Sequence, residues 1–201
     1  GIMVIIEKET VAQVPVLHVV KKEKREERLP FILFIHGFTS AKEHNLHFGY
    51  LLAEAGYRVI LPDALHHGER DSSLSERELQ LAFWNIVTRT ITEIKKIKEE
   101  LELRNLIQPD RIGLAGTSMG GIVTFGALAV YPWIKAAVSL MGNPMYEAFF
   151  DALIETGKKM GVAIPLSDEQ LKREKARLMK YDLSIQPEKL AGRPLLIWHG
   201  K

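Results

Sequence analysis

The chain alternates short, continuously apolar runs with longer amphipathic stretches. An uninterrupted apolar run of about four to eight residues is typical of a parallel strand that is buried on both faces. Runs of this kind lie at 31–36, 57–61, 111–116, 134–140 and 194–198. Because helix-prone segments separate most of them, the pattern predicts an α/β fold, with a mostly parallel sheet and helices on both faces.

The longest amphipathic stretch covers residues 75–103. It opens with Ser75-Glu-Arg-Glu78, a capping box in which both side chains satisfy free N–H groups at a helix start. Its apolar positions then recur at steps of three or four, at Leu79, Phe83, Val87, Ile91, Ile94, Ile97 and Leu101. This spacing predicts one long helix with a single buried face.

Other segments predict a hairpin and two shorter helices. Two β-rich runs at 4–8 and 14–21, around a short link, predict a hairpin at the edge of the sheet. A helix is expected over 45–55, where Gly56 ends it, and another over 122–130.

A long segment, 142–193, separates the last two predicted strands. It contains an aromatic and methionine-rich stretch at 145–150, and a second capping box, Ser167-Asp-Glu-Gln170, opens a charged helix. We interpret the segment as a helical cap over one end of the sheet; the alternative is a peripheral helical excursion. The chain is expected to form a single α/β domain over 1–201 with this cap inserted in it.

Composition and charge exclude several classes of function. Apolar residues make up 46% of the 201 residues and charged residues 26%, as in an ordinary globular protein. A formal net charge of +2 gives no reason to expect nucleic acid or an anionic membrane as a partner. There is no cysteine, which excludes disulfides and a cysteine nucleophile and fits a cytoplasmic location. Charged residues follow soon after the N-terminus, so neither a signal peptide nor a membrane span is expected there.

Residues 111–121, Arg-Ile-Gly-Leu-Ala-Gly-Thr-Ser-Met-Gly-Gly, carry the most informative motif. A short apolar run leads into Gly-x-Ser-x-Gly, and a helix-prone run follows. This is the pattern of a nucleophile elbow, a sharp strand-to-helix turn that lifts the hydroxyl of Ser118 above the end of the sheet. The turn crowds its neighbours, so Gly116 and Gly120 must lack a Cβ atom. We therefore predict that Ser118 is a catalytic nucleophile.

Three features together resemble the α/β-hydrolase superfamily: a strand that ends in His36-Gly-Phe-Thr39, the elbow about 80 residues later, and the order of the strands. Within it, the chain is similar to the dienelactone-hydrolase-like bacterial esterases. The segments His36-Gly-Phe-Thr-Ser-Ala-Lys-Glu-His-Asn45 and Asp63-Ala-Leu-His-His-Gly-Glu-Arg70 are especially similar to the YitV-type esterases of bacilli. The resemblance implies a serine hydrolase that cleaves a carboxylic ester through an acyl-enzyme, without a cofactor.

The resemblance also implies an oxyanion hole. In such enzymes two backbone N–H groups stabilise the negative charge on the carbonyl oxygen, and they correspond here to Phe38 and Met119. His36 is expected to be a structural residue of the same loop. The apolar stretch after 140 could line an acyl pocket, or could simply pack the cap on the sheet. The predicted substrate-pocket residues are His67, Met141, Met145 and Phe149.

The acid and the base of a triad are not evident. The chain holds seven histidines, His18, His36, His44, His47, His66, His67 and His199. In this fold the order is serine, acid, histidine, and only His199 follows Ser118. His199-Gly200 resembles the His-Gly that precedes the acid in the family, so His199 is not expected to be the base. Asp168 and Asp182 are expected to be helix-cap or surface residues.

We therefore expect the acid and base beyond residue 201, in a last strand–helix unit of about 40–50 further residues. Without that unit, one edge of the sheet would be left open, which favours aggregation.

Other functions are compatible with the same residues. Peptidases and thioesterases use the same acyl-transfer chemistry, and this fold can also serve binding without catalysis. A dinucleotide site is disfavoured because the glycines do not follow the Gly-x-Gly-x-x-Gly spacing. His44, His47, His66 and His67 could cluster after inner strands but match no metallohydrolase motif, so no metal is expected. The expected partner is a small-molecule acyl ester.

Overall fold

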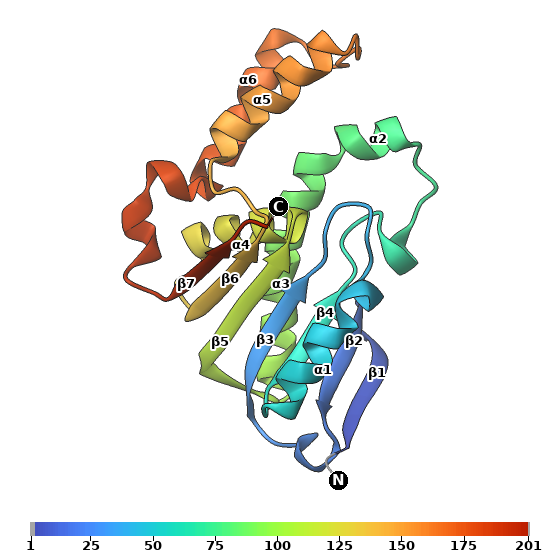
Figure 1. Cartoon of the computed structure of the whole chain (residues 1–201), viewed down its shortest axis with the longest axis vertical. Helices are drawn as coiled ribbons and strands as arrows, with labels where there is room; N and C mark the ends of the chain where they lie inside the picture. Colours follow the sequence, from blue (N-terminus) through green and yellow to red (C-terminus); the bar gives the residue numbers. More distant parts are fainter. Residues whose placement is uncertain (1–2, 201) are drawn as a thin grey trace.

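The computed structural model describes residues 3–200 and has a seven-stranded sheet with helices on both faces (Figure 1). The strands are β1 (Val4–Val11), β2 (Val14–Lys21), β3 (Leu29–Ile35), β4 (Arg58–Pro62), β5 (Ile107–Thr117), β6 (Ala136–Leu140) and β7 (Leu195–Trp198). Their order across the sheet is β1-β2-β4-β3-β5-β6-β7. β2 pairs antiparallel with both β1 and β4, and every other neighbouring pair is parallel. The predicted α/β fold and the edge hairpin are confirmed.

The helices are α1 (Leu46–Glu54), α2 (Glu76–Leu81), α3 (Phe83–Leu103), α4 (Met119–Val130), α5 (Tyr146–Lys159) and α6 (Asp168–Leu178). Short 3-10 helices lie at Lys22–Lys24, Lys42–Asn45, Gly68–Arg70, Met179–Tyr181, Leu183–Ile185 and Pro187–Leu190. α1 packs on one face of the sheet, and α3 and α4 cover the other. Successive side chains of β3 point to opposite faces of the sheet. Leu33 and Ile35 therefore pack in the core with α3 and α4, whereas Phe34 packs in the core with α1.

The stretch 75–103 forms two helices rather than the single helix that its apolar spacing predicts. The capping box of Ser75 and Glu78 is present, but α2 ends at Leu81, and Ala82, with φ −85° and ψ −2°, caps the end of α2 and the start of α3. α3 then runs along the sheet with its apolar face buried, while α2 is largely exposed. The prediction of one helix was wrong: the apolar spacing continues through Ala82, but only α3 packs closely against α4 and β5.

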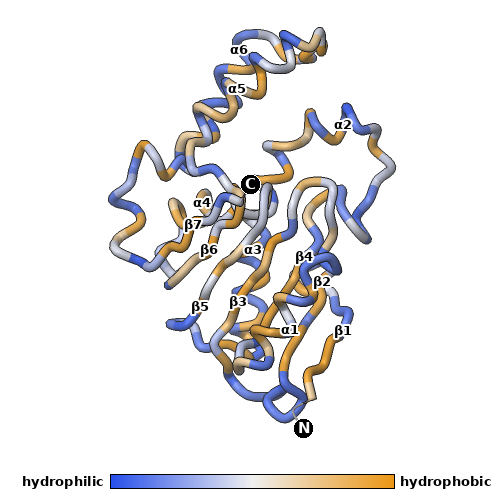
Figure 2. Tube along the Cα trace, in the orientation of Figure 1, coloured by the Kyte–Doolittle hydropathy of each residue, from blue (hydrophilic) through white to orange (hydrophobic). Residues whose placement is uncertain are grey.

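The segment between β6 and β7 contains α5 and α6, which extend beyond the carboxyl ends of the parallel strands (Figure 1). The base of this pair is anchored in the core, where Tyr146, Phe150 and Leu178 are buried. Figure 2 shows apolar residues concentrated along the strands and a mostly hydrophilic α6. The capping box of Ser167 and Gln170 at the start of α6 is confirmed.

The face that α1 covers is only partly filled. An apolar groove of about 850 Å³ lies beside α1, over β3, β5, β6 and β7, and Phe34, Leu52 and Val138 are among its lining residues. Ser118 does not line it. Within residues 3–200, no helix has both the length and the apolar character needed to cross a membrane.

Candidate active site

Ser118 lies in a sharp turn between the end of β5 and the start of α4. Its backbone has φ 55° and ψ −116°, a conformation that residues other than glycine rarely adopt. Its N–H donates to Leu140 O at 2.7 Å, which ties the turn to the end of β6. The residue is exposed. A strained, exposed serine between a strand and a helix has the geometry expected of a nucleophile elbow.

Close packing of the backbone explains the two glycines of the motif. A Cβ atom at Gly116 would collide with the carbonyl group of Gly120, and a Cβ atom at Gly120 would collide with Ile35 O. The turn can therefore form only where both positions lack a side chain.

The loop after β3 lies directly against the serine. A Cβ atom added at Gly37 would be 3.3 Å from Ser118 Cβ and 3.9 Å from Ser118 Oγ. Phe38 follows Gly37 in this loop, and Met119 is the first residue of α4. Both residues predicted to form an oxyanion hole thus lie near Ser118. Phe38 lies in the loop that packs against it, and Met119 follows it in the sequence. Their role as donors stays a prediction.

His36 joins this loop to the loop after β4. The ring is fully buried; its Nδ1 donates to Gly37 O at 2.7 Å, and its Nε2 accepts from the N–H of Ala64 at 3.0 Å. Burial lowers the pKa of His36 to about 4, so the ring is neutral at pH 7. Both ring nitrogens are occupied, which agrees with the structural role expected for His36.

His67 makes a second connection between the same loops. Its Nε2 accepts from the N–H of Thr39 at 2.9 Å, and its Nδ1 donates to Leu65 O at 2.8 Å. The residue is 3% exposed, and its ring lies 5.6 Å from the ring of Phe38, edge to face. Burial lowers its pKa as well, against the opposing effect of the bond to Leu65 O. The structure thus buries this predicted pocket residue against the loop after β3, where it contacts Phe38 and Thr39.

A third connection is a group of charges around a buried lysine, here called the loop cluster: Lys42, Glu43, Asp63 and Glu69. Lys42 Nζ lies 2.6 Å from both Asp63 Oδ2 and Glu69 Oε2, and 2.9 Å from Glu43 Oε1. Burial disfavours the ammonium, but its three hydrogen bonds outweigh burial and raise the pKa of Lys42 above its ordinary value. Asp63 also accepts from the backbone N–H groups of Lys42 and Glu69, at 3.0 Å each. Sequence patterns do not reveal Lys42, because lysine is rarely a buried residue.

No described histidine is hydrogen-bonded to the Ser118 hydroxyl. His44 and His66 bond to nearby serine hydroxyls, at 2.7 Å each. His199 follows β7 and is exposed. Within residues 3–200, no three His, Asp or Glu side chains are grouped so that they could hold a metal ion. In the part of the chain that the structure describes, the predicted nucleophile thus has no histidine base in contact with it.

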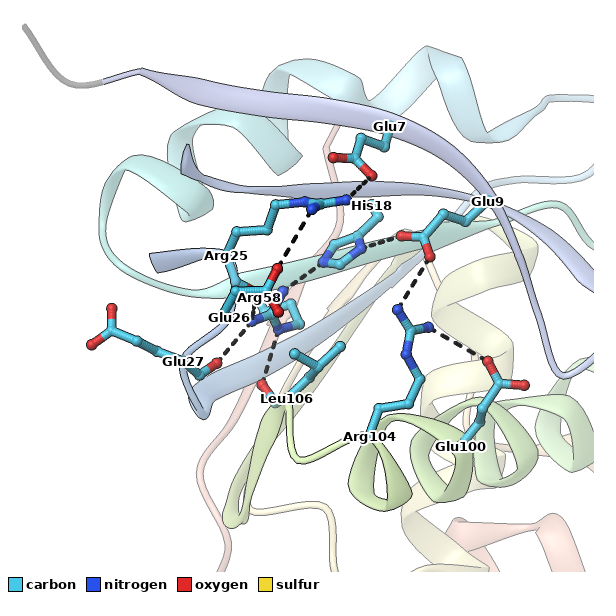
Figure 3. Close-up of polar contacts among 10 residues, drawn as sticks. All are labelled: Glu7, Glu9, His18, Arg25, Glu26, Glu27, Arg58, Glu100, Arg104 and Leu106. Carbon is cyan, nitrogen blue, oxygen red and sulfur yellow. Dashed lines mark hydrogen bonds and ion pairs between the residues drawn. The ribbon is translucent and has the colours of Figure 1, made fainter. Parts of the chain in front are cut away.

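A second buried polar group lies at the amino ends of the parallel strands, away from Ser118 (Figure 3). We call it the hairpin cluster; its side chains are Arg58, His18 and Glu9. The Arg58 guanidinium donates to Leu106 O at 2.9 Å, Arg25 O and Glu27 O at 2.8 Å, and His18 Nε2 at 2.7 Å. Burial lowers the pKa of Arg58 to about 10, so it stays charged at pH 7. His18 bonds to Glu9 through its other nitrogen, so this cluster connects side chains of β1, β2 and β4.

The predicted pocket residues of the segment after β6 lie at its base. Met141 and Met145 are each 46% exposed, and Phe149 is half-buried. The Phe83 ring lies 5.3 Å from the Phe38 ring and 6.2 Å from the Phe149 ring, both edge to face. Aromatic contacts therefore run from the loop beside Ser118 to α5.

Asp168 and Asp182 of this segment lie at helix starts, as expected. Asp182 is buried and accepts from the N–H of Glu147 in the first turn of α5 and from the N–H of Ser184, at 3.0 Å each. Asp168 lies in the exposed first turn of α6.

The profile of a family described as "alpha/beta hydrolase fold" matches residues 30–193. The chain belongs to the α/β-hydrolase fold family. The matched range includes β3, the elbow and α4, so the family assignment and the local geometry of Ser118 refer to the same elements.

Named relatives support the resemblance to bacterial esterases. "Putative esterase YitV" of Bacillus subtilis is 54% identical over 198 residues, which cover 98% of this chain and 78% of that protein. "Esterase YjfP" of Escherichia coli is 32% identical over 204 residues, with the same coverages. The structure titled "Putative Dienelactone Hydrolase" from Klebsiella pneumoniae matches 100% of this chain and 86% of its own, with a TM-score of 0.62 and 15% identity. The predicted resemblance to YitV-type, dienelactone-hydrolase-like α/β hydrolases is confirmed.

Proposed function

We propose that this chain carries the nucleophile and the oxyanion hole of a carboxylesterase-type serine hydrolase. Ser118 Oγ attacks the carbonyl carbon of an acyl ester, the alcohol leaves, and water then releases the acid from the acyl-enzyme. The N–H groups of Phe38 and Met119 stabilise the oxyanion in both steps. The observation that carries the proposal is the strained, exposed Ser118 with the loop at Gly37 against it.

In this proposal, residues beyond 201 supply the acid and the base of the triad. A serine hydroxyl is a weak nucleophile until a base accepts its proton. Two observations support the placement: no histidine within residues 3–200 bonds to Ser118 Oγ, and His199 lies exposed at the end of β7. The order serine, acid, histidine in this fold also puts both groups late in the chain.

The proposed substrate is a small-molecule ester with a small or medium acyl group. Phe149, Met141 and Met145 would line the apolar acyl pocket at the base of α5, where the two methionines are exposed and Phe149 is half-buried. The relatives YitV and YjfP are both named esterases. A peptidase or a thioesterase would use the same catalytic groups. Comparing kcat/KM for a p-nitrophenyl ester, an anilide and a thioester of the same acyl chain identifies the preferred leaving group.

Replacing the nucleophile tests the proposal most directly. In the full-length protein, Ser118→Ala should lower kcat for a p-nitrophenyl acyl ester by about 10⁴–10⁶-fold, because no other group can form the acyl-enzyme. The matched control is Ser72→Ala, which removes an exposed hydroxyl that bonds to His66 and should leave kcat unchanged. Turnover retained in Ser118→Ala would reject the assignment.

Covalent labelling separates an enzyme from a non-catalytic binding protein of the same fold. A fluorophosphonate should add to Ser118 of the full-length protein, and the modified peptide should be identified by mass spectrometry. A protein that hydrolyses no ester and takes up no label would be a binding protein instead.

A further inference from the structure

We propose that His67 is a positioning residue for the oxyanion hole, and that it acts by holding the backbone of Thr39 next to Phe38. The proposal rests on the proposed function, since it concerns the donor loop of the same hydrolytic site. It differs from the substrate-pocket role that the sequence suggests for His67.

The first observation is strain in the loop that His67 holds. Thr39 has φ +67°, in the left-handed region that a β-branched residue rarely adopts. Its N–H donates to His67 Nε2 at 2.9 Å. A strained conformation persists only where its surroundings hold it in place, and this hydrogen bond is one of the contacts that do so.

The second observation is that the acceptor itself is fixed. Because His67 Nδ1 bonds to Leu65 O at 2.8 Å, the hydrogen lies on Nδ1 and the lone pair of Nε2 points to Thr39. The ring is 3% exposed, so water does not compete for this lone pair. Its packing against the Phe38 ring, with centroids 5.6 Å apart, adds a second contact to the donor loop.

The third observation is that the loop bearing His67 is rigidly built. Asp63, at its start, accepts from Lys42 Nζ at 2.6 Å and from the Glu69 N–H at 3.0 Å. Arg70, at its end, donates to Asp63 O at 3.1 Å and makes a two-point ion pair with Glu93. Because this loop is rigid, His67 can hold the Thr39 backbone in a fixed position beside Ser118. A displacement of about 1 Å at such a site can cost 10²-fold in rate.

A pair of amide substitutions in the full-length protein tests the role. The amide oxygen introduced by His67→Gln would lie near the position of Nε2, whereas the shorter side chain of His67→Asn reaches only the position of Nδ1. We expect His67→Asn to lower kcat for a p-nitrophenyl ester by about 10–100-fold with KM changed less than about 3-fold. His67→Gln should keep kcat within about 3-fold of the wild type, because it restores the acceptor. The matched control is His47→Asn, which changes an exposed histidine on α1.

Thermal unfolding and an oxyanion-dependent inhibitor complete the test. A trifluoromethyl ketone, which forms a hemiketal oxyanion with the serine, should lose affinity for the His67→Asn variant by about the same factor as kcat. The proposal is overturned if the His67→Asn and His67→Gln variants have equal kcat, or if kcat falls only in proportion to a loss of folded protein. Ser118→Ala measured alongside separates the two proposals: its loss of turnover with no effect at His67 would reject only the positioning role.

Discussion

The loop cluster and the hairpin cluster both bury a cation, but they neutralise it in different ways. Lys42 is surrounded by three carboxylates from the loops after β3 and β4. Arg58 is surrounded by three backbone carbonyl oxygens and a histidine nitrogen, at the amino ends of the strands. One cluster therefore depends on charge pairs between side chains, and the other on the fixed fork of a guanidinium.

The two clusters differ because different backbone groups need hydrogen-bond partners at the two ends of the sheet. At the carboxyl ends, the loops beside Ser118 have no strand ladder, so side chains must satisfy their backbone groups. Asp63 does this for two N–H groups while it pairs with Lys42. At the amino ends, Arg58 donates to the carbonyl groups of Glu27 and Leu106, where the chain enters β3 and β5. We expect disruption of the first cluster to alter catalysis and stability, and disruption of the second to alter stability alone.

The largest effect is expected from Lys42→Met. Removal of the ammonium leaves the fully buried carboxylate of Asp63 without its cation, which typically costs about 3–5 kcal/mol of the free energy of unfolding. The loop beside Ser118 should also shift, so kcat of the folded fraction should fall. Urea unfolding and ester turnover measure the two effects in the full-length protein. Glu43→Gln, which changes an exposed member of the cluster, should cost less than about 1 kcal/mol; an equal cost for both variants would contradict the comparison.

Low pH should reduce the free energy of unfolding, because protonation of His36 disfavours the folded loops at the carboxyl ends of the strands. Folding holds its pKa at about 4, below the ordinary 6.5, so the folded state favours the neutral ring. Its contribution is complete above pH 6.5 and is lost as the pH falls toward 4, by about 3 kcal/mol in total. The pKa values of His67 and His18 are lowered in the same direction by burial.

Urea unfolding at pH 7.5, 5.5 and 4.5 measures this dependence. His36→Asn should be less stable at pH 7.5 but should lose less stability between pH 7.5 and 4.5, because the titrating ring is gone. An unchanged slope in that variant would show that other groups cause the acid sensitivity.

The smallest effect is expected from Arg58→Lys. A lysine keeps the charge but cannot reach three carbonyl groups and His18 at once, so buried acceptors lose their donors at a cost of about 2 kcal/mol. The kcat of the folded protein should not change. Arg104→Lys, on the exposed side of the same cluster, should cost less than about 0.5 kcal/mol. A fall in kcat for Arg58→Lys would mean that the two ends of the sheet are coupled.

Local patterns predicted much of this molecule. Apolar runs located the strands of the sheet, and two capping boxes located the starts of α2 and α6. The Gly-x-Ser-x-Gly motif located the elbow, because the backbone contacts at Gly116 and Gly120 leave no alternative residue. The break at Ala82 escaped prediction, since the apolar spacing continues through it and only the surrounding packing changes.

The sequence by itself determined the fold class and the position of Ser118, because both depend on short-range spacing and on steric limits of the backbone. Tertiary structure alone decided which polar side chains are buried and what they bind. The atoms of Lys42 and Asp63 meet across 21 residues, those of Thr39 and His67 across 28, and those of Arg58 and His18 across 40. Lysine, aspartate and arginine are found mostly on protein surfaces, yet Lys42, Asp63 and Arg58 are buried here. Their burial becomes favourable only when the folded loops bring the matching donor or acceptor within hydrogen-bond distance.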